Sequence, residues 1–432
     1  MLLLNPVILS VLTMIILCLF KLNVIIALLI SALVAGEVAG MGLSNTMSIL
    51  INGMGGNSET ALSYILLGTL AVVVNNSGLA KIIAIKISKV VKNKKFLLIF
   101  ILAAIACSSQ NLIPVHIAFI PILIPPLLSL MNKLKIDRRA VACALTFGLK
   151  APYIVLPVGF GLIFQTIVRD QLVANNVPVT LKDIYSVNWL LGLGMFLGLL
   201  TAVFISYRKP REYKMNDNEM QADKEIIFER KHMFALIGAI IAFAIQLWTG
   251  SLPLGALFAL TFMVITKVIV WKDIDSTLDG GIQLMGFIAF VMLVAAGYGN
   301  VIRETGAVPE LVTGVISIIG TSKVLGAFIM LLVGLIVTLG IGTSFGTIPI
   351  LAVIYCPLAI KLGFSPAGVA ILVAAAGALG DAGSPASDST LGPTSGLNAD
   401  GQHEHIWDTC VPTFLHYNIP LIIFALIGSL IF

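Results

Sequence analysis

Charged residues are scarce in this chain of 432 residues. Asp, Glu, Lys and Arg together make up only 11% of it, whereas hydrophobic residues make up 58%, and the mean hydropathy is +1.04. Soluble domains carry about 25% charged residues, so the composition excludes that class. Many apolar runs reach the roughly 20 residues that an α-helix needs to cross a bilayer. The sequence therefore predicts an all-α polytopic membrane protein.

Several other features are missing. The five cysteines are scattered without a Cys-x-x-Cys pair, so we expect small apolar residues rather than disulfides or metal ligands. Residues 1–20 lack a basic n-region, and a second apolar run follows at once, which indicates a transmembrane helix rather than a cleaved signal peptide. No nucleotide-binding loop and no Gly-x-Gly-Asp protease motif occur. The sequence thus argues against an ATP-driven pump and against an enzyme, and it predicts no cofactor.

One long polar segment, 208–231, divides the chain and holds seven basic and six acidic residues. We expect it to be a cytoplasmic linker between a first repeat, 1–207, and a second repeat, 232–432. Residues recur between the halves with an offset of 235 or 228 positions. The matched pairs are Ser109 with Ser344, Pro114 with Pro349, Pro157 with Pro385, and Gly78 with Gly306.

In each half an apolar hairpin precedes an interrupted helix. The hairpins are predicted over 96–131 and 324–361, and each has a tip rich in small polar residues. The interrupted helices are predicted to break at 150–152 and at 381–388, where Gly, Pro, Ser and charged residues replace the apolar run. Breaks at corresponding positions of two halves are typical of transporters that bind their substrate at the midplane of the bilayer.

Charge predicts how the chain is oriented. When the basic segments 81–95, 133–139 and 208–231 face the cytoplasm, most of the 26 basic residues lie on that side, as the positive-inside rule expects. The two hairpins then enter from opposite faces. The prediction is two inverted-topology repeats with about 10 transmembrane helices, two re-entrant hairpins and two broken helices. Twelve plain spans are the alternative.

A helix that breaks inside a membrane exposes free N–H groups at one stump and free carbonyls at the other, and these bind anions and cations respectively. The second break contains two acids, Asp381 and Asp388, together with Ser384 and Ser387. Carboxylates, hydroxyls and carbonyls form an oxygen-only ligand set, suited to Na⁺ or to carrying a proton. We therefore expect Na⁺ at Asp381 and Asp388. The alternative for Asp388 is an ordinary helix end in interfacial water.

Lys150 is the only basic residue within a predicted span. It can pair with a carboxylate, hold the carboxylate of a substrate, titrate, or extend to the interface. The hairpin tips supply further candidates for ion or substrate binding. These are Ser108, Ser109 and Asn111 in the first tip, with Gln110 and His116 beside them, and Thr343 and Ser344 in the second.

Two other polar patterns are read as structural. Lysines alternate with Ile and Val over 79–93, which predicts an interfacial amphipathic helix and not a nucleic-acid site. His403-Glu404-His405 has no further Cys or His at metal-ligand spacing, so a solvated loop is expected there.

The segment 380–390, Gly-Asp-Ala-Gly-Ser-Pro-Ala-Ser-Asp-Ser-Thr, followed by 401–412, resembles the signature of the NhaC-type sodium/proton antiporter family of the ion transporter superfamily. Ala382 and Gly383 stand where that family more typically carries His-Cys. A similar branch is described as amino-acid, particularly histidine, permeases. The resemblance implies inverted repeats, paired hairpins, a bacterial inner (plasma) membrane location and a homodimer.

These observations predict an ion-coupled secondary transporter that exchanges Na⁺ and H⁺ by alternating access. The alternative is a permease that couples Na⁺ or H⁺ to a small amino acid such as histidine, which additionally needs a group for the carboxylate of the amino acid. A channel can use similar hairpins, but two hairpins of opposite orientation favour alternating access. The expected partners are Na⁺, H⁺, the lipid bilayer and a second copy of the chain, without nucleic acid.

Overall fold

The computed structural model describes residues 4–20, 22–78, 91, 94–111, 120–214, 229–307, 310–311, 313–314, 317, 320–341, 344–385 and 387–432. Within these residues the secondary structure is helical and contains no strand. By length and composition four helices can cross a membrane, or five if the bent pair Arg138–Val155 and Phe160–Ala174 counts as one span, and shorter apolar helices accompany them. The all-α prediction is confirmed, whereas the number of spans stays a prediction.

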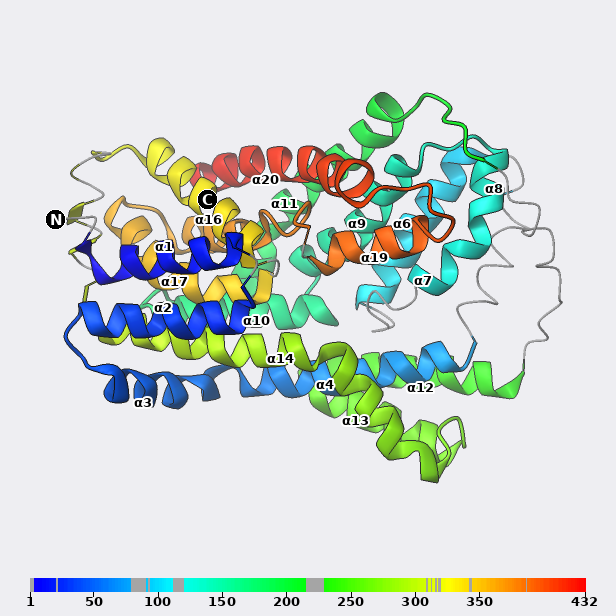
Figure 1. Ribbon diagram of the computed structural model, residues 1–432, viewed down its shortest axis with the longest axis horizontal. Coiled ribbons are helices and arrows are strands. Elements are labelled where there is room, and N and C mark those ends of the chain that lie inside the picture. The colour runs from blue at the N-terminus through cyan, green and yellow to red at the C-terminus, as the bar shows by residue number, and fades with distance from the viewer. Residues whose placement is uncertain are drawn as a thin grey trace.

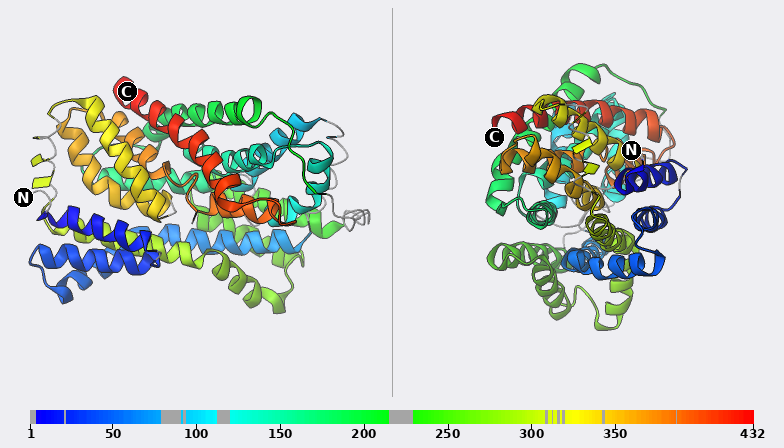
Figure 2. Two further views of the ribbon diagram at one scale, coloured as in Figure 1. Left: turned by 45° about the horizontal axis from the view of Figure 1, so that its top comes forward. Right: turned by 90° about the vertical axis from the view of Figure 1, so that its left-hand side faces the viewer.

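The helices form two layers, and both views in Figure 2 keep them apart. The lower layer in Figure 1 consists of α2 (Val24–Val38), α3 (Leu43–Met54), α4 (Ser58–Asn76), α12 (Arg230–Thr249), α13 (Leu252–Ile265) and α14 (Ile274–Glu304), with α1 (Pro6–Leu19) packed beside α2. Small residues let α4 and α14 approach closely: a Cβ on Gly281 would lie 2.5 Å from the Thr69 amide nitrogen.

The upper layer contains the interrupted helices. In chain order its elements are α6 (Lys95–Asn111), α7 (Ile120–Leu123), α8 (Leu128–Lys133), α9 (Arg138–Val155), α10 (Phe160–Ala174), α11 (Leu181–Thr201), α16 (Lys323–Ile341), α17 (Ser344–Lys361), α18 (Pro366–Ala378), α19 (Asp388–Leu397), the π-helical turn η8 (His405–Cys410) and α20 (Val411–Ile431). The Ala-rich α18 lies at the centre, and it is buried from Gly368 to its end because its small side chains admit α11, α16, α17 and α20 on all sides.

Two segments return to the place where they begin, as the hairpin prediction requires. The Lys95 ammonium donates to the Arg208 carbonyl (3.1 Å), and the Arg211 amide donates to the Lys135 carbonyl (3.1 Å), so both ends of 95–135 meet the same stretch of the chain. Likewise the Lys323 ammonium lies 5.5 Å from the ring centroid of Phe364, just beyond α17. Residues 112–119 and 342–343, like most of the amphipathic helix expected over 79–93, lie outside the described residues.

The first interrupted helix breaks later than predicted. The expectation of a break at 150–152 was wrong, because α9 continues through Pro152 to Val155 and α10 then departs at 48°. Proline removes one backbone donor but leaves the following turn intact, and the Leu156 amide still donates to the Pro152 carbonyl (2.7 Å). The chain turns at 156–159, where Gly159 has φ 58°.

The second interruption covers 379–387, close to the predicted 381–388, and turns at Gly380 (φ 80°) and Gly383 (φ 111°). Two residue pairs matched in the sequence occupy similar places. Pro157 and Pro385 each lie in a break, and Gly78 and Gly306 both have positive φ, at 82° and 63°. This agreement is what an internal repeat predicts.

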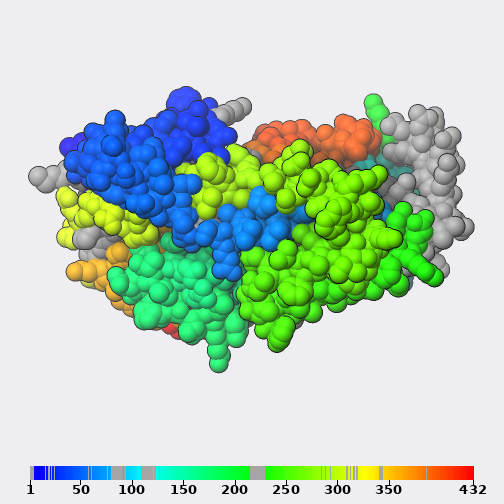
Figure 3. Space-filling model, turned by 90° about the horizontal axis from the view of Figure 1, so that it is seen from below, coloured from blue at the N-terminus to red at the C-terminus, as the bar shows by residue number. Residues whose placement is uncertain are grey.

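The two halves of the sequence interleave. α4, from the first half, packs along α14, from the second, and α11 packs along α20 in the same way. The face in Figure 3 accordingly combines blue N-terminal helices with green helices that follow the linker. Each layer therefore draws on both 1–207 and 232–432, whose assignment as repeats stays a prediction.

Candidate functional site

Asp381 lies in the second break, and its carboxylate accepts hydrogen bonds from three residues, Lys150, Ser344 and Ser387. It forms an ion pair with Lys150 of α9, although the two residues are 231 positions apart. Asp381 is 1% exposed and Lys150 8%, so the structure resolves the alternatives for Lys150 in favour of a buried pair. A buried charge needs such a partner, because an unpaired one is costly in a low-dielectric interior.

The first residue of α17, Ser344, also binds the Asp381 carboxylate. The Ser344 amide donates to Asp381 Oδ2 (3.2 Å), and the Ser344 hydroxyl donates to the same oxygen. The Ser387 hydroxyl donates to Oδ1. Free N–H groups at a helix N-terminus carry partial positive charge, so α17 adds to the attraction of Lys150 for an anion. Lys150, Ser344 and Ser387 were all expected at the site.

Asp388, the first residue of α19, differs from Asp381 in its surroundings. It is half-buried, and among the described residues no group donates a hydrogen bond to its carboxylate. It lies within electrostatic range of Lys150 and Asp381. When all three side chains are ionised, they carry two negative charges and one positive charge. The cluster then has a net charge of −1, which favours binding of a cation.

Polar side chains fix the break around these acids. The Asn418 side chain accepts a hydrogen bond from the Gly380 amide (2.8 Å) and donates to the Ala382 carbonyl (2.7 Å). Ser389 donates to the Asp381 carbonyl (3.1 Å). Ser384, an expected ligand, instead donates to the Leu339 carbonyl of α16 (3.1 Å) and so ties the break to the second hairpin.

The first break has a similar support. The Ile154 carbonyl at the end of α9 accepts hydrogen bonds from Gln165 of α10 (3.0 Å) and from Asn188 of α11 (3.1 Å). Asn188 and Asn418 thus belong to α11 and α20, the helices that follow the two broken pairs. Amide side chains are suited to this task because they can satisfy a free backbone carbonyl or amide away from water.

Sequence reasoning missed Asn418 and also Tyr153. The Tyr153 hydroxyl lies 2.7 Å from the Ser344 hydroxyl, and the Lys150 ammonium lies 5.2 Å from the Tyr153 ring centroid. Tyr153 belongs to a cluster of aromatic rings beside the site, with neighbouring centroids 4.9–6.1 Å apart: Tyr64, Tyr153, Phe160, Phe164 and Phe345. Tyr153 could have been identified from the sequence, because a residue three positions after Lys150 lies on the same face of a helix.

The first hairpin contributes less to the visible site. Ser108 donates to the Ala104 carbonyl of its own helix (3.0 Å). α6 does pack tightly on α9 near Lys150, because a Cβ on Gly148 would lie 2.8 Å from the Cys107 amide nitrogen. Other predicted residues cannot be placed: the side chains of Ser109, Gln110 and Asn111, and all of His116 and Thr343, lie outside the described residues.

The expectation of a solvated loop at His403-Glu404-His405 was wrong for His403, which is 1% exposed and lies 2.7 Å from the Thr409 hydroxyl. Burial lowers the pKa of His403 to about 4. His405 Nε2 donates to the Pro385 carbonyl (2.9 Å) and so reaches back to the second break. No cluster of three potential metal-ligating residues occurs among the described side chains.

An ionic network joins this loop to the start of the linker. Arg138 donates to both carboxylate oxygens of Asp400, at 2.7 Å for the longer bond, and Arg211 donates to Asp408 (2.7 Å). The hydrogen bond to Asp408 raises the pKa of Arg211. The residues around the linker thus connect the N-terminal end of α9 to the loop that follows α19.

Comparisons with known proteins agree with this architecture. The Na⁺/H⁺ antiporter family matches residues 144–428, and a second group, the Na⁺-H⁺ antiporter family, matches residues 5–91. The chain is 49% identical to an uncharacterized membrane protein of Vibrio parahaemolyticus, over 99% of this chain and 100% of that one. It is 45% identical to "Putative amino acid transporter YuiF" of Bacillus subtilis, with 99% and 100% covered.

Two solved structures share the fold. One is the YdaH transporter of Alcanivorax borkumensis, with a TM-score of 0.60, 15% identity, and 90% of this chain and 89% of that one covered. The other is MtrF of Neisseria gonorrhoeae, described within a class of antimetabolite efflux pumps, with a TM-score of 0.58, 12% identity, and 90% and 85% covered.

These findings confirm the resemblance noted in the signature at 380–390 and identify a secondary transporter rather than an enzyme. Such a chain is a multi-pass membrane protein, which in bacteria resides in the inner membrane. By the match over 144–428 and by the identity to full-length relatives, the chain belongs to the Na⁺/H⁺ antiporter family.

Proposed function

We propose that the chain exchanges Na⁺ for H⁺ by alternating access at Asp381 and Asp388. The observation that carries the proposal is the cluster of two carboxylates and one lysine in the broken region, with its net negative charge. A site of this kind attracts a monovalent cation and also contains groups that exchange protons. Family membership supports Na⁺ and H⁺ as the coupled ions.

Competition between Na⁺ and Lys150 provides the coupling. Asp381 Oδ2 is occupied by the Lys150 ammonium and by Ser344, so an entering Na⁺ gains that oxygen only when the ammonium leaves. A lysine that has lost its buried partner releases a proton, because an isolated ammonium is poorly solvated there. One Na⁺ then replaces one H⁺, and the net charge of the site is the same in both states.

The surrounding oxygens complete the Na⁺ site in this proposal. Asp388 supplies a carboxylate that lacks hydrogen-bond donors among the described residues, and Ser384, Ser387 and Ser344 supply hydroxyls. Ser108, Ser109, Asn111 and Thr343 act at the hairpin tips, which alternately close the site from either side. Inverted repeats account for this symmetry, and the chain works as a homodimer.

Amino-acid transport is the second candidate. Lys150 and the N-terminus of α17 together hold a carboxylate here, that of Asp381, and the same two groups can hold the carboxylate of an amino acid. The name of the Bacillus subtilis relative adds support. In this alternative Asp381 releases both groups when the substrate enters, and Na⁺ or H⁺ drives uptake.

One experiment separates the two candidates. The purified chain is reconstituted in vesicles that contain a pH-sensitive dye, a Na⁺ gradient is imposed, and uptake of labelled histidine is followed in parallel. Exchange predicts a Na⁺-driven change in internal pH without histidine. A pH change or histidine uptake that occurs only when both Na⁺ and histidine are present contradicts exchange and supports the permease.

A further inference from the structure

Away from the transport site, α13 diverges from α14 and α4 in the lower layer (Figure 1). The space between the three helices is an apolar groove of about 390 Å³. Leu257, Val264 and Ile265 line it from α13, and Leu278 lines it from α14. Ile265 is 74% exposed, so the groove opens on the surface of the molecule rather than into its core.

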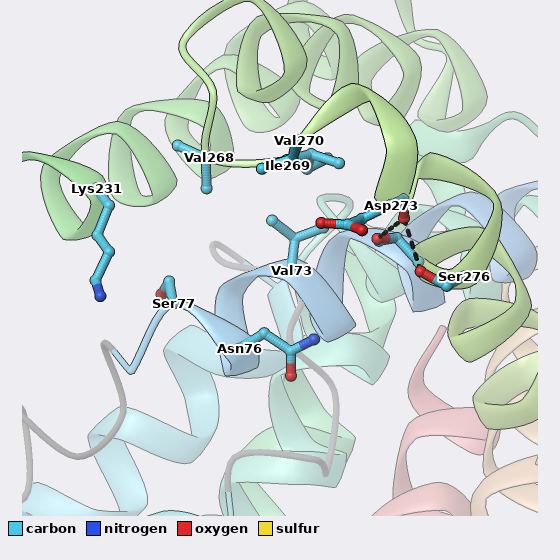
Figure 4. A pocket seen from close by; sticks show the side chains of 10 residues that line it. Val73, Asn76, Ser77, Lys231, Val268, Ile269, Val270, Asp273 and Ser276 are labelled. Atoms are coloured by element: carbon cyan, nitrogen blue, oxygen red, sulfur yellow. Dashed lines mark hydrogen bonds between the residues drawn. The ribbon is translucent and has the colours of Figure 1, made fainter.

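A polar pocket of about 320 Å³ adjoins this groove. Ile269 and Thr277 line both, so the two spaces meet where the loop after α13 leads into α14. In Figure 4 Lys231 of α12 lies on one side of the pocket and Asp273 on the opposite side, with Asn76, at the end of α4, between them. The pocket therefore contains one cation and one anion at the end of an apolar groove.

Neither charge is strongly engaged by the protein. Among the described residues nothing donates to the Asp273 carboxylate, whose backbone carbonyl instead accepts the Ser276 hydroxyl (3.0 Å). Lys231 pairs with Glu229 at 3.2 Å, but both side chains are more than half exposed, and such pairs contribute little. The two charges are thus available to a ligand.

We infer that the groove and the polar pocket together bind one phospholipid whose headgroup carries a phosphate and a primary ammonium. An acyl chain fills the groove, the phosphate meets Lys231, and the ammonium donates to Asp273. Trp271 lines the groove and is 80% exposed, and exposed tryptophans of membrane proteins are enriched at the level of the headgroups. Phosphatidylethanolamine has this chemistry, whereas phosphatidylcholine has no N–H to donate and phosphatidylglycerol has no cation for Asp273.

The test measures bound lipid on the purified full-length chain by native mass spectrometry. The detergent-solubilised protein is mixed with phosphatidylethanolamine, phosphatidylcholine or phosphatidylglycerol of equal chain length. We expect selective retention of phosphatidylethanolamine. Asp273→Asn removes one charge-assisted hydrogen bond, so it should weaken binding about tenfold. Thr261→Trp, on the α13 wall of the groove, should abolish binding by filling the space.

Matched controls make the result specific. Asp275→Asn changes a neighbouring acid of α14 that does not line the pocket. Thr201→Trp changes another exposed threonine that, like Thr261, donates to the carbonyl four residues earlier. Both controls should bind like the wild type. Equal retention of the three lipids, or retention by Thr261→Trp, would overturn the inference. So would a shift from dimer to monomer in Thr261→Trp without loss of lipid, because a second copy would then occupy the groove.

Discussion

At the scale of residues, the buried pair of Lys150 and Asp381 organises the site. Both were identifiable from the sequence because charges inside apolar runs are rare and usually functional. Their pairing was one of several possibilities for Lys150, and only the packing of α9 against the second break decides among them. Asn418 was harder to identify, because its partners are the backbone groups of Gly380 and Ala382, which no sequence pattern marks.

Removal of one partner should destabilise the protein more than removal of both. Lys150→Ala leaves Asp381 buried without its cation, and breaking such pairs costs about 3–5 kcal/mol. The double variant Lys150→Ala with Asp381→Asn should recover much of that loss. Thermal unfolding in detergent measures both, with Lys182→Ala as the control at an exposed position. The pairing would be contradicted if the loss of stability in the double variant equalled the sum of the losses in the two single variants.

A second residue-scale prediction concerns pH. Burial lowers the pKa of His403 to about 4 from an ordinary value of 6.5, so between these values the unfolded chain binds the proton and the folded chain does not. Stability should therefore fall as pH drops through this window and be unaffected above it. His403→Gln should flatten the stability profile between pH 4 and 6.5, whereas His232→Gln, at the start of α12, serves as the control. An unchanged slope in His403→Gln would refute the assignment.

At the scale of elements, the hairpins and broken helices determine where backbone groups are free. The sequence located the second break well, because Gly380, Gly383 and the acids coincide there. It placed the first break too early, at Pro152, because proline usually interrupts a helix. α9 nevertheless continues past Pro152, and the chain turns only at the segment that contains Pro157 and Gly159. The position of a break thus depends on which backbone groups find partners.

Asn418→Leu tests that dependence. The variant leaves the Gly380 amide and the Ala382 carbonyl buried without the side chain that satisfies them, each at a cost of about 1–3 kcal/mol. We expect lower thermal stability together with loss of transport, because Asp381 lies between the two groups. Asn45→Leu, at an exposed position of α3, is the control. Wild-type transport by Asn418→Leu would show that the two hydrogen bonds of Asn418 do not position Asp381.

At the scale of the whole molecule, the two layers interleave both halves of the chain. Sequence analysis predicted the polytopic class from composition. It predicted the first returning segment from its basic flanks, and the second from its polar interruption and the alternation of the spans before it. It did not predict that α4 would pack along α14 or α11 along α20, because an apolar helix surface does not specify its neighbour. Small residues at these contacts, such as Gly281 against Thr69, allow two helices to approach closely. Such residues do not indicate in the sequence which helix is the neighbour.

The orientation of the halves can be tested by labelling. In a variant without the native cysteines, Lys209→Cys in the linker should react with an impermeant thiol reagent only from the cytoplasmic side. Ala174→Cys, at the far end of the α9–α10 pair, should react only from the opposite side. Labelling of both from one side would contradict the crossing of α9 and α10 and, with it, the inverted repeats.

The most direct test of the proposed exchange is Na⁺-driven pH change in vesicles that contain Asp381→Asn. Asparagine keeps nearly the volume of aspartate but cannot ionise, so the flux per inserted protein should fall to background. Asp388→Asn should require more Na⁺ for the same flux, and Asp275→Asn should match the wild type. Na⁺-driven exchange at the wild-type rate in Asp381→Asn would contradict the account.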